Sequence, residues 1–358
     1  MSPPLGSAPD TQDAGAPSPA VRRTRRRTAG WGTVLLAGIL AVYSARAATR
    51  DQVPYDLEVP DPAVLLRPAV LTELEDLSCG ECHARVVEEW ASTAHALSWL
   101  DEVYQESIGR RRRPELCHAC HIPGPLLTGE KPGRPAAREA SLHLGVSCDT
   151  CHLASDGAIL GAGSSETDAH VTRRSEFLSG AGLNELCASC HSTSIGPVIG
   201  IAKDFVASEQ ARRGRSCVGC HMAALESTGD DAEVGPVIRS HSLQTPRDPA
   251  FLRRAFALSL TVEGRVSRIA IANTAGHRVP GLIGRKIRFE AQALDSEGQE
   301  LATGSLTIDV RAHIPVDGNI VLELAAGAAS VTVEGWHLDP RSAEEVRFLS
   351  LTLEPEGG

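Results

Sequence analysis

The stretch Cys79-Gly80-Glu81-Cys82-His83 carries the pattern that decides the fold, Cys-x-x-Cys-His, and the 358-residue chain contains five copies of it. All ten cysteines belong to these copies. They are Cys79, Cys82, Cys117, Cys120, Cys148, Cys151, Cys187, Cys190, Cys217 and Cys220, and the closing histidines are His83, His121, His152, His191 and His221. This spacing is the attachment signature of c-type haem, in which two thiols add to the porphyrin vinyl groups and the adjacent histidine binds iron. We therefore expect five covalently attached haem c groups.

Other uses of paired cysteines explain the pattern less well. Zinc sites would not require a histidine after every second cysteine. A thioredoxin-like motif normally occurs once, near a βαβ pattern. Five disulfides would account for ten cysteines in an exported chain, but not for histidine at all five places.

The composition agrees with a chain that encloses large cofactors. Aromatic residues make up only 4% of the sequence, which is low for a core filled by side chains alone, and porphyrins would take their place. The formal net charge is −10, the opposite of the basic balance expected of a nucleic-acid-binding protein.

The N-terminal part has the layout of an export signal. Residues 1–20 are rich in Pro, Ala, Ser and Gly and are expected to be disordered, and an arginine-rich stretch, an apolar run over 31–45 and Ala45-Arg46-Ala47 follow. We expect residues 1–47 to contain a signal peptide, or an uncleaved anchor to the inner membrane, and the mature protein to be periplasmic or otherwise exported. Removal of residues 1–47 would take away six Arg and two Asp and bring the net charge to −14. Redox partners with a basic docking surface are therefore expected.

Three further segments follow. Residues 48–70 contain four prolines and are expected to form a linker. Residues 71–249 hold all five motifs, whose first cysteines are only 30–39 residues apart, so the haems must pack against one another. We expect this pentahaem cytochrome c domain to consist mainly of α-helices and loops with little regular structure.

Histidine is the main candidate for the second axial ligand of each iron. The chain has only two methionines, and Met222 directly follows a motif histidine, so it cannot reach the opposite face of its own haem. Bis-histidine ligation lacks the methionine that raises the reduction potential, so low potentials are expected. The candidate distal ligands are His95, His143, His170, His241 and His277.

His95 allows the most specific prediction. Apolar residues over 84–107 follow a helical period, and on one helix His83 and His95 would be about 18 Å apart. They cannot hold the same iron, so His95 is predicted to serve a different haem. His170 follows a Gly/Ser-rich stretch, Gly157–Thr167, which is expected to be a flexible loop.

The array resembles the tetrahaem cytochrome c family of ammonia-oxidising bacteria over roughly residues 75–245. The likeness is carried by the first motif with Ser92-Thr93-Ala94-His95, by Gly145-Val146-Ser147-Cys148, and by the last motif with Met222. The resemblance implies that the histidine after the first motif ligates another haem. It also implies that an open haem is one arrangement this family uses.

From residue 250 the pattern changes to short alternating segments. Seven strands at this spacing predict an all-β sandwich of the immunoglobulin-like type over residues 250–358. They are expected at 256–262, 266–273, 287–294, 301–310, 320–324, 330–335 and 346–353. The loop Asn273–Gly281 resembles a Gly-His-x-x-Pro loop of β-domains appended to multihaem cytochromes, and its His277 is predicted to cap a haem. His313 and His337 are expected at the surface of the sandwich.

Two functions remain open. The first is single-electron transfer between redox partners, with an inner-membrane quinol-oxidising protein as one candidate donor and an oligomer or filament as a further arrangement. The second is an oxidoreductase that acts on a small nitrogen or sulfur compound at one open haem. All five motifs keep histidine and five further histidines could close every iron, which favours electron transfer and no catalytic residue.

Overall fold

The computed structural model describes residues 78–179, 182–194, 200–225, 238–282, 284–342 and 344–355. The expectations for residues 1–47 and 48–70 lie outside these ranges. None of the helices within the ranges has the length and hydropathy that a bilayer span requires. The predicted boundary at 249/250 falls at the start of a short helix (Pro249–Arg253).

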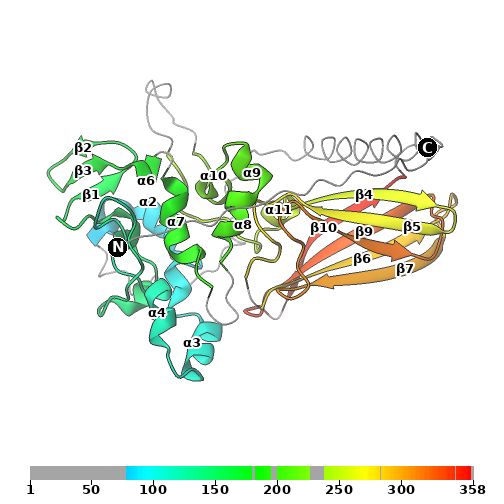
Figure 1. Ribbon diagram of the computed structural model, residues 1–358, viewed down its shortest axis with the longest axis horizontal. Coiled ribbons are helices and arrows are strands. Elements are labelled where there is room, and N and C mark those ends of the chain that lie inside the picture. The colour runs from blue at the N-terminus through cyan, green and yellow to red at the C-terminus, as the bar shows by residue number, and fades with distance from the viewer. Residues whose placement is uncertain are drawn as a thin grey trace, which may run out of the picture. The chain divides into compact units, whose positions relative to one another are not determined.

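The motif-bearing region is built from short helices and one small sheet (Figure 1). The elements are η3 (Ser78–Glu81), α2 (Ala84–Ala91), η4 (Ala96–Ser98), α3 (Glu102–Gly109), α4 (Glu115–His121), η5 (Leu142–Leu144), α5 (Cys148–His152), β1 (Ile159–Gly161), β2 (Ser165–Glu166), β3 (Val171–Arg174), α6 (Glu176–Ser179), α7 (Leu183–His191), α8 (Ala202–Ala207), α9 (Glu209–Arg212), α10 (Cys217–His221) and α11 (Pro249–Arg253).

The predicted continuous helix over 84–107 is wrong. The chain forms α2, then η4, then α3, because polar side chains cap the backbone between them. Thr93 Oγ1 accepts a hydrogen bond from Ala96 N at 3.2 Å, and Asp101 accepts one from Tyr104 N at 2.7 Å. Local side-chain bonds of this kind compete with helix continuation.

The predicted flexible loop over 157–167 is also partly wrong. Residues 159–161 and 165–166 form strands β1 and β2, which pair with β3 on either side in the order β1-β3-β2. The β1–β3 pairing is parallel and the β2–β3 pairing is antiparallel. His170 therefore directly precedes a strand rather than lying in a free loop.

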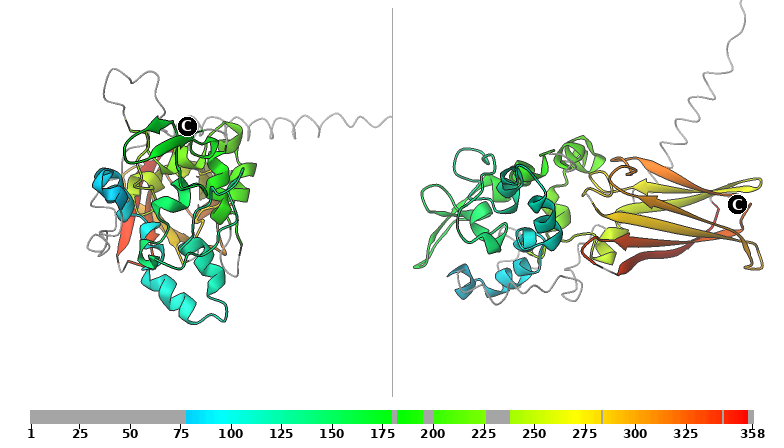
Figure 2. Two further views of the ribbon diagram at one scale, coloured as in Figure 1. Left: turned by 90° about the vertical axis from the view of Figure 1, so that its left-hand side faces the viewer. Right: turned by 90° about the horizontal axis from the view of Figure 1, so that it is seen from below.

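Seven strands follow, at the predicted places. They are β4 (Phe256–Glu263), β5 (Val266–Asn273), β6 (Lys286–Leu294), β7 (Glu300–Ile308), β8 (Asn319–Leu324), β9 (Ser330–Leu338) and β10 (Glu345–Leu353). They lie alongside one another in Figure 1 and in the right-hand view of Figure 2. All pairings among them are antiparallel and form two sheets, in the orders β4-β5-β8 and β10-β9-β6-β7.

The two sheets share one core. Along β5, β6 and β9 buried and half-buried residues alternate, as expected when one face of each strand packs inward. Phe289 of β6 is fully buried and meets Phe256 of β4 and Phe348 of β10 at ring-centroid distances of 5.2 and 6.0 Å. These rings join the sheets into a sandwich with a single hydrophobic core.

Replacing Phe289 with alanine should destabilise the sandwich by about 3–5 kcal/mol, since the change leaves a cavity between the two sheets. Urea unfolding followed by far-UV circular dichroism measures this loss. Leu301→Ala is the control, because Leu301 in β7 is 45% exposed and its truncation should cost less than about 1 kcal/mol. Equal losses in the two variants would contradict the assignment of Phe289 to the core.

Candidate haem-binding site

The Cys-x-x-Cys-His motifs occupy the ends of short helices. Helices α4, α5, α7 and α10 each end at the histidine of a motif. In the first motif η3 ends at Glu81, and His83 N donates to the Cys79 carbonyl at 2.9 Å, as in a helical turn. On a helix the first cysteine, the second cysteine and the histidine stand at i, i+3 and i+4, so all three side chains project from one side. The local fold therefore presents two thiols and one imidazole together, as haem attachment requires.

Backbone carbonyls fix the ring orientation of three motif histidines and of His277. Each Nδ1 atom concerned lies 2.7–2.8 Å from a carbonyl oxygen, which leaves Nε2 free to bind a metal. The pairs are His121 with Ser98, His152 with Leu160, His221 with Gln244, and His277 with Arg278. Burial lowers the pKa of both His95 and His221 to about 4, which keeps these rings neutral.

Four motif histidines each face a histidine from elsewhere in the chain. The ring centroids are 6.2–6.3 Å apart and the ring planes are inclined by 11–39°. The pairs are His83 with His170, His191 with His95, His152 with His241, and His221 with His277.

This separation fits a metal between the two imidazoles. A metal–nitrogen bond of about 2.0–2.1 Å on each side, plus about 1.1 Å from each nitrogen to its ring centre, gives about 6.2–6.4 Å. Within the described ranges, no group of three or more His, Cys, Asp or Glu side chains could hold a bare metal ion. Paired imidazoles therefore suit an iron whose other ligands belong to a porphyrin.

His95 is held in place by the segment that precedes the third motif. Its carbonyl accepts hydrogen bonds from Val146 N at 2.9 Å and from Ser98 Oγ at 2.7 Å. Gly145 has a positive φ of 56°, and a Cβ there would lie 2.3 Å from the His95 carbonyl oxygen. Only glycine allows this close approach. The segment that leads into the third motif therefore positions His95, which faces the histidine of the fourth motif.

His277 comes from the sandwich region and is backed by an ion pair. Arg278, the next residue, contacts Asp204 of α8 through its backbone N at 3.2 Å, Nε at 2.5 Å and Nη2 at 2.8 Å. Hydrogen bonds from Arg278 hold the pKa of Asp204 below its usual range, so the carboxylate stays charged at neutral pH. The bidentate side-chain contact, together with the backbone hydrogen bond, therefore fixes the loop that carries His277.

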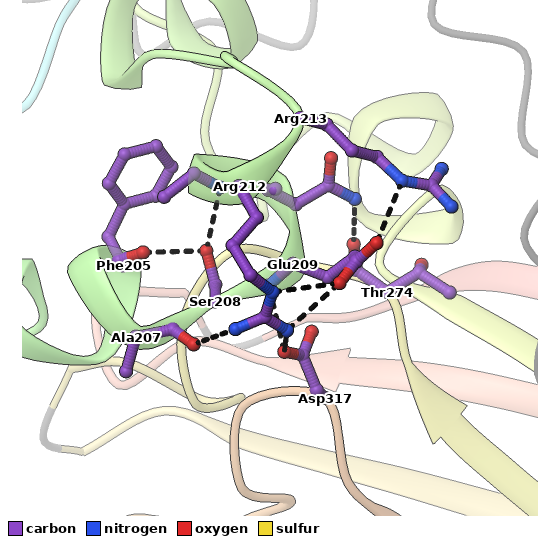
Figure 3. Close-up of polar contacts among 10 residues, drawn as sticks. Phe205, Ala207, Ser208, Glu209, Arg212, Arg213, Thr274 and Asp317 are labelled. Carbon is purple, nitrogen blue, oxygen red and sulfur yellow. Dashed lines mark hydrogen bonds and ion pairs between the residues drawn. The ribbon is translucent and has the colours of Figure 1, made fainter.

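Helix α9 makes a second set of polar contacts with the sandwich loops, shown in Figure 3. Asp317 accepts hydrogen bonds from Glu209 N at 2.8 Å and from Arg212 at 3.3 Å. Gln210 Nε2 donates to the carbonyl of Thr274 at 2.9 Å. The contacts anchor α9 beside the loop that leads into His277.

The second motif is built differently. Its His121 stacks face to face on Tyr104, with centroids 3.7 Å apart and planes inclined by 8°, a distance that leaves no room for an atom between the rings. Among the described residues, no imidazole faces His121 with the ring-centroid distance of about 6.2 Å that the four pairs show. His143, a predicted distal ligand, has a buried Nε2 without a hydrogen-bond partner, and so does His118, which packs edge-on against Trp99.

Thiols of different motifs lie close to one another. They perturb each other's pKa in pairs that join the first motif to the third, the second to the fourth, and the fourth to the fifth. The pairs are Cys79 with Cys148, Cys120 with Cys190, and Cys187 with Cys217. Cys151 also acts electrostatically on both cysteines of the fourth motif. The motifs therefore lie in the order one, three, four, with two and five both beside four.

The expectation that His337 lies on the surface is wrong. It is 1% exposed, because the alternation of β9 points it inward, opposite Ile287 of β6 and Val346 of β10. Sequence reasoning also missed Asp204, Arg278 and Tyr104. Arg278 adjoins the predicted His277, which was a usable signal, whereas Asp204 carries none because its partner is 74 residues away.

Comparison with known proteins agrees with haem attachment. A family model described as "Cytochrome c554 and c-prime" matches residues 78–153, which include the first three motifs. Curated protein sequences give no match.

Solved structures give distant likenesses. A penta-heme cytochrome c552 from Thermochromatium tepidum aligns over 79% of this chain and 98% of its own, at 16% identity and a TM-score of 0.49. A glycosyl hydrolase family 2 member from Bacteroides cellulosilyticus aligns over 28% of this chain and 14% of its own, at 11% identity and a TM-score of 0.18. The red sea bream transglutaminase aligns over 35% of this chain and 22% of its own, at 10% identity and a TM-score of 0.18.

The repeated motifs, their helical placement and the match of the family model to residues 78–153 support a multihaem c-type cytochrome with covalently bound haem.

Proposed function

We propose that the protein carries five haem c groups and transfers single electrons between redox partners through mainly bis-histidine irons. The observation that carries the proposal is the 6.2–6.3 Å separation of four histidine pairs, which leaves space for one metal atom in each. A bound haem supplies one-electron chemistry by cycling its iron between the ferric and ferrous states. Each pair of imidazoles would hold one haem iron, and ligation without methionine would favour low reduction potentials.

The contacts between motifs support a connected path. Cys79 lies close to Cys148, and Cys151 perturbs the pKa of both cysteines of the fourth motif, so the attachment points of the first, third and fourth haems adjoin. We assign the order first, third and fourth haem to the main path, with the second and fifth as branches from the fourth. In this arrangement the fourth haem is the junction of the array.

The second motif supports one further candidate function. His121 has no facing imidazole in the described ranges, so either His143 closes this iron in the holoprotein or the position stays open. An open iron would bind a small nitrogen or sulfur compound, and the protein would then be an oxidoreductase at this haem. The four paired irons would supply or remove its electrons.

Location and partners belong to the same proposal. The basic stretch, apolar run and Ala-x-Ala site before residue 48 support export, with or without a membrane tether. The acidic mature chain supports partners with a basic docking surface, and a quinol-oxidising membrane protein is a suitable donor class.

We also propose that the sandwich is of the immunoglobulin-like class. Counted along the chain, its strands follow the order first-second-fifth in one sheet and fourth-third-sixth-seventh in the other. The likeness of the motif region to the tetrahaem cytochromes of ammonia oxidisers remains part of this proposal.

Two measurements on the purified ferric protein test the proposal. The mass of the intact chain counts the attached haems, and fewer than five would contradict the assignment of one haem to each motif. Electron paramagnetic resonance then counts low-spin irons. Four low-spin signals with one high-spin signal that responds to cyanide or nitric oxide would favour an open second haem, and five low-spin signals would favour His143 as its ligand. Fewer than four low-spin irons would overturn the bis-histidine proposal.

Replacing Asp204 with asparagine should loosen the His277 loop. The variant keeps the side-chain shape but loses the charge that Arg278 contacts, and the expected loss is about 1–3 kcal/mol. A minority of high-spin iron from one haem should appear in the ferric spectrum, together with partial carbon monoxide binding in the ferrous state. Asp317→Asn is the matched control, because it breaks the contact to Arg212 and leaves the neighbour of His277 intact. A high-spin fraction of the same size in both variants would contradict a specific role for Asp204.

A further inference from the structure

Three arginines, one of them buried, gather where the ends of strands β6 and β9 meet the motif-bearing region. The side chain of Arg285, just before β6, is only 7% exposed, and Asp339 is its nearest acidic partner at 3.8 Å. Asp339 is already engaged by Arg247 at 2.9 Å and by Arg341 at 3.4 Å. Arg341 also pairs with Asp101, the N-cap of α3.

The cluster holds more positive than negative charge. Three guanidinium groups face two carboxylates, and the buried ring of His337 is neutral because burial lowers its pKa to about 4. Burial lowers the pKa of Arg285 to about 10, so this group still carries its charge at neutral pH. A buried charge without a full partner is costly, and an anion placed beside it would remove that cost.

Two nitrogens of the cluster are available to such an anion. Arg285 Nε is buried and has no hydrogen-bond partner in the structure, and neither has Nε2 of His337. A guanidinium presents donors in a planar fork that matches the two oxygens of a carboxylate. The unsatisfied nitrogen atoms therefore favour the binding of an oxyanion over that of a neutral group.

The cluster borders the second motif. Asp101 and Arg341 are the acid and the arginine whose charges act on the ring of His121. The carbonyl of Ser98, three residues before Asp101, accepts the hydrogen bond from His121 Nδ1 at 2.7 Å. The ring of His121 therefore lies within range of the charge of Arg341.

We propose that Arg285, with Arg341 and His337, forms a binding site for a carboxylate, and that a propionate of the haem attached at Cys117 and Cys120 occupies it. The inference rests on the proposed attachment of a haem at this motif. The sandwich would then supply residues that contact the second haem, in addition to the contact that it makes through His277. A free oxyanion such as phosphate offers the same chemistry and is distinguished by experiment.

Arg285→Gln in the full holoprotein tests the site, with Arg285→Lys as the charge-conserving variant. Spectroelectrochemical titration at several pH values follows all the haems. In Arg285→Gln the midpoint potential of one haem should fall, because loss of a nearby positive charge favours ferric iron. Its potential should also become dependent on pH between about pH 5 and 8, as the carboxylate loses the partner that kept it ionised. Arg285→Lys should restore most of the wild-type behaviour.

Arg268→Gln is the matched control, because Arg268 lies on the same sandwich and is paired with Glu263 and Glu323 at an exposed site. If potentials in Arg285→Gln match those of this control and only stability changes, the site is overturned and Arg285 is purely structural. A saturable shift of the wild-type potential by inorganic phosphate, absent in Arg285→Gln, would overturn the haem propionate as occupant and assign the site to a free oxyanion. Haem counts and spin states of the same samples report separately on the proposed function.

Discussion

His95→Ala should convert the haem attached at Cys187 and Cys190 from low spin to high spin and leave the first haem unchanged. His95 faces His191 at 6.2 Å, and burial keeps its imidazole neutral. Alanine removes one of the two axial nitrogens, so the fourth iron should become five-coordinate or bind water. Electron paramagnetic resonance should show the loss of one low-spin signal, and the ferrous variant should bind carbon monoxide at one site.

The consequence for electron transfer should be large, because the fourth motif lies beside the second, third and fifth. Reduction of the remaining haems through a single entry point should slow in a stopped-flow experiment. His118→Ala is the control, because His118 packs against Trp99 and faces no motif histidine at the ligation distance. Loss of the first haem's signal in His95→Ala, or no change in any signal, would contradict the pairing.

His277→Ala should open the fifth haem while the sandwich stays folded. The ring centroid of His277 lies 6.3 Å from that of His221, with the ring planes only 11° apart. His277 projects from the loop between β5 and β6 and is not part of the sandwich core. One high-spin iron should appear, and cyanide should bind to it. His313→Ala, in another loop of the sandwich, should leave all spin states unchanged.

A second measurement separates ligation from docking. Urea unfolding of His277→Ala should show one sandwich transition close to that of the wild type, because the Asp204–Arg278 contact still holds the sandwich against α8. A variant that keeps five low-spin haems would refute the assignment of His277 to the fifth iron.

The strands were predictable because their signal is local. An alternating pattern of apolar residues, interrupted by glycine, proline and aspartate, located β4 to β10 within a residue or two at most ends, and only β9 runs three residues further than expected. The helix over 84–107 failed for the opposite reason. Its period looked continuous, but Thr93 and Asp101 satisfy backbone groups locally and divide it, and Ala94 and Val103 of the expected apolar stripe are exposed.

The site was predictable in its members but not in its pairs. The motif fixes which cysteines and histidines are adjacent, since all lie within five residues. The partner of His83 is His170, 87 residues away, and nothing in either local sequence encodes that meeting. Likewise Arg285 and Asp339 become neighbours only through the β6–β9 register, so the buried charge cluster is a property of the folded chain alone.

The proximity of thiols of different motifs bears on how the protein is made. Cys79 and Cys148, and likewise Cys187 and Cys217, perturb each other's pKa, so thiols of different motifs would be neighbours if the chain folded before haem was added. In an oxidising compartment disulfide cross-links between such neighbours would trap the chain without cofactor. Under the proposed export, haem attachment to reduced thiols would therefore precede compaction of the chain.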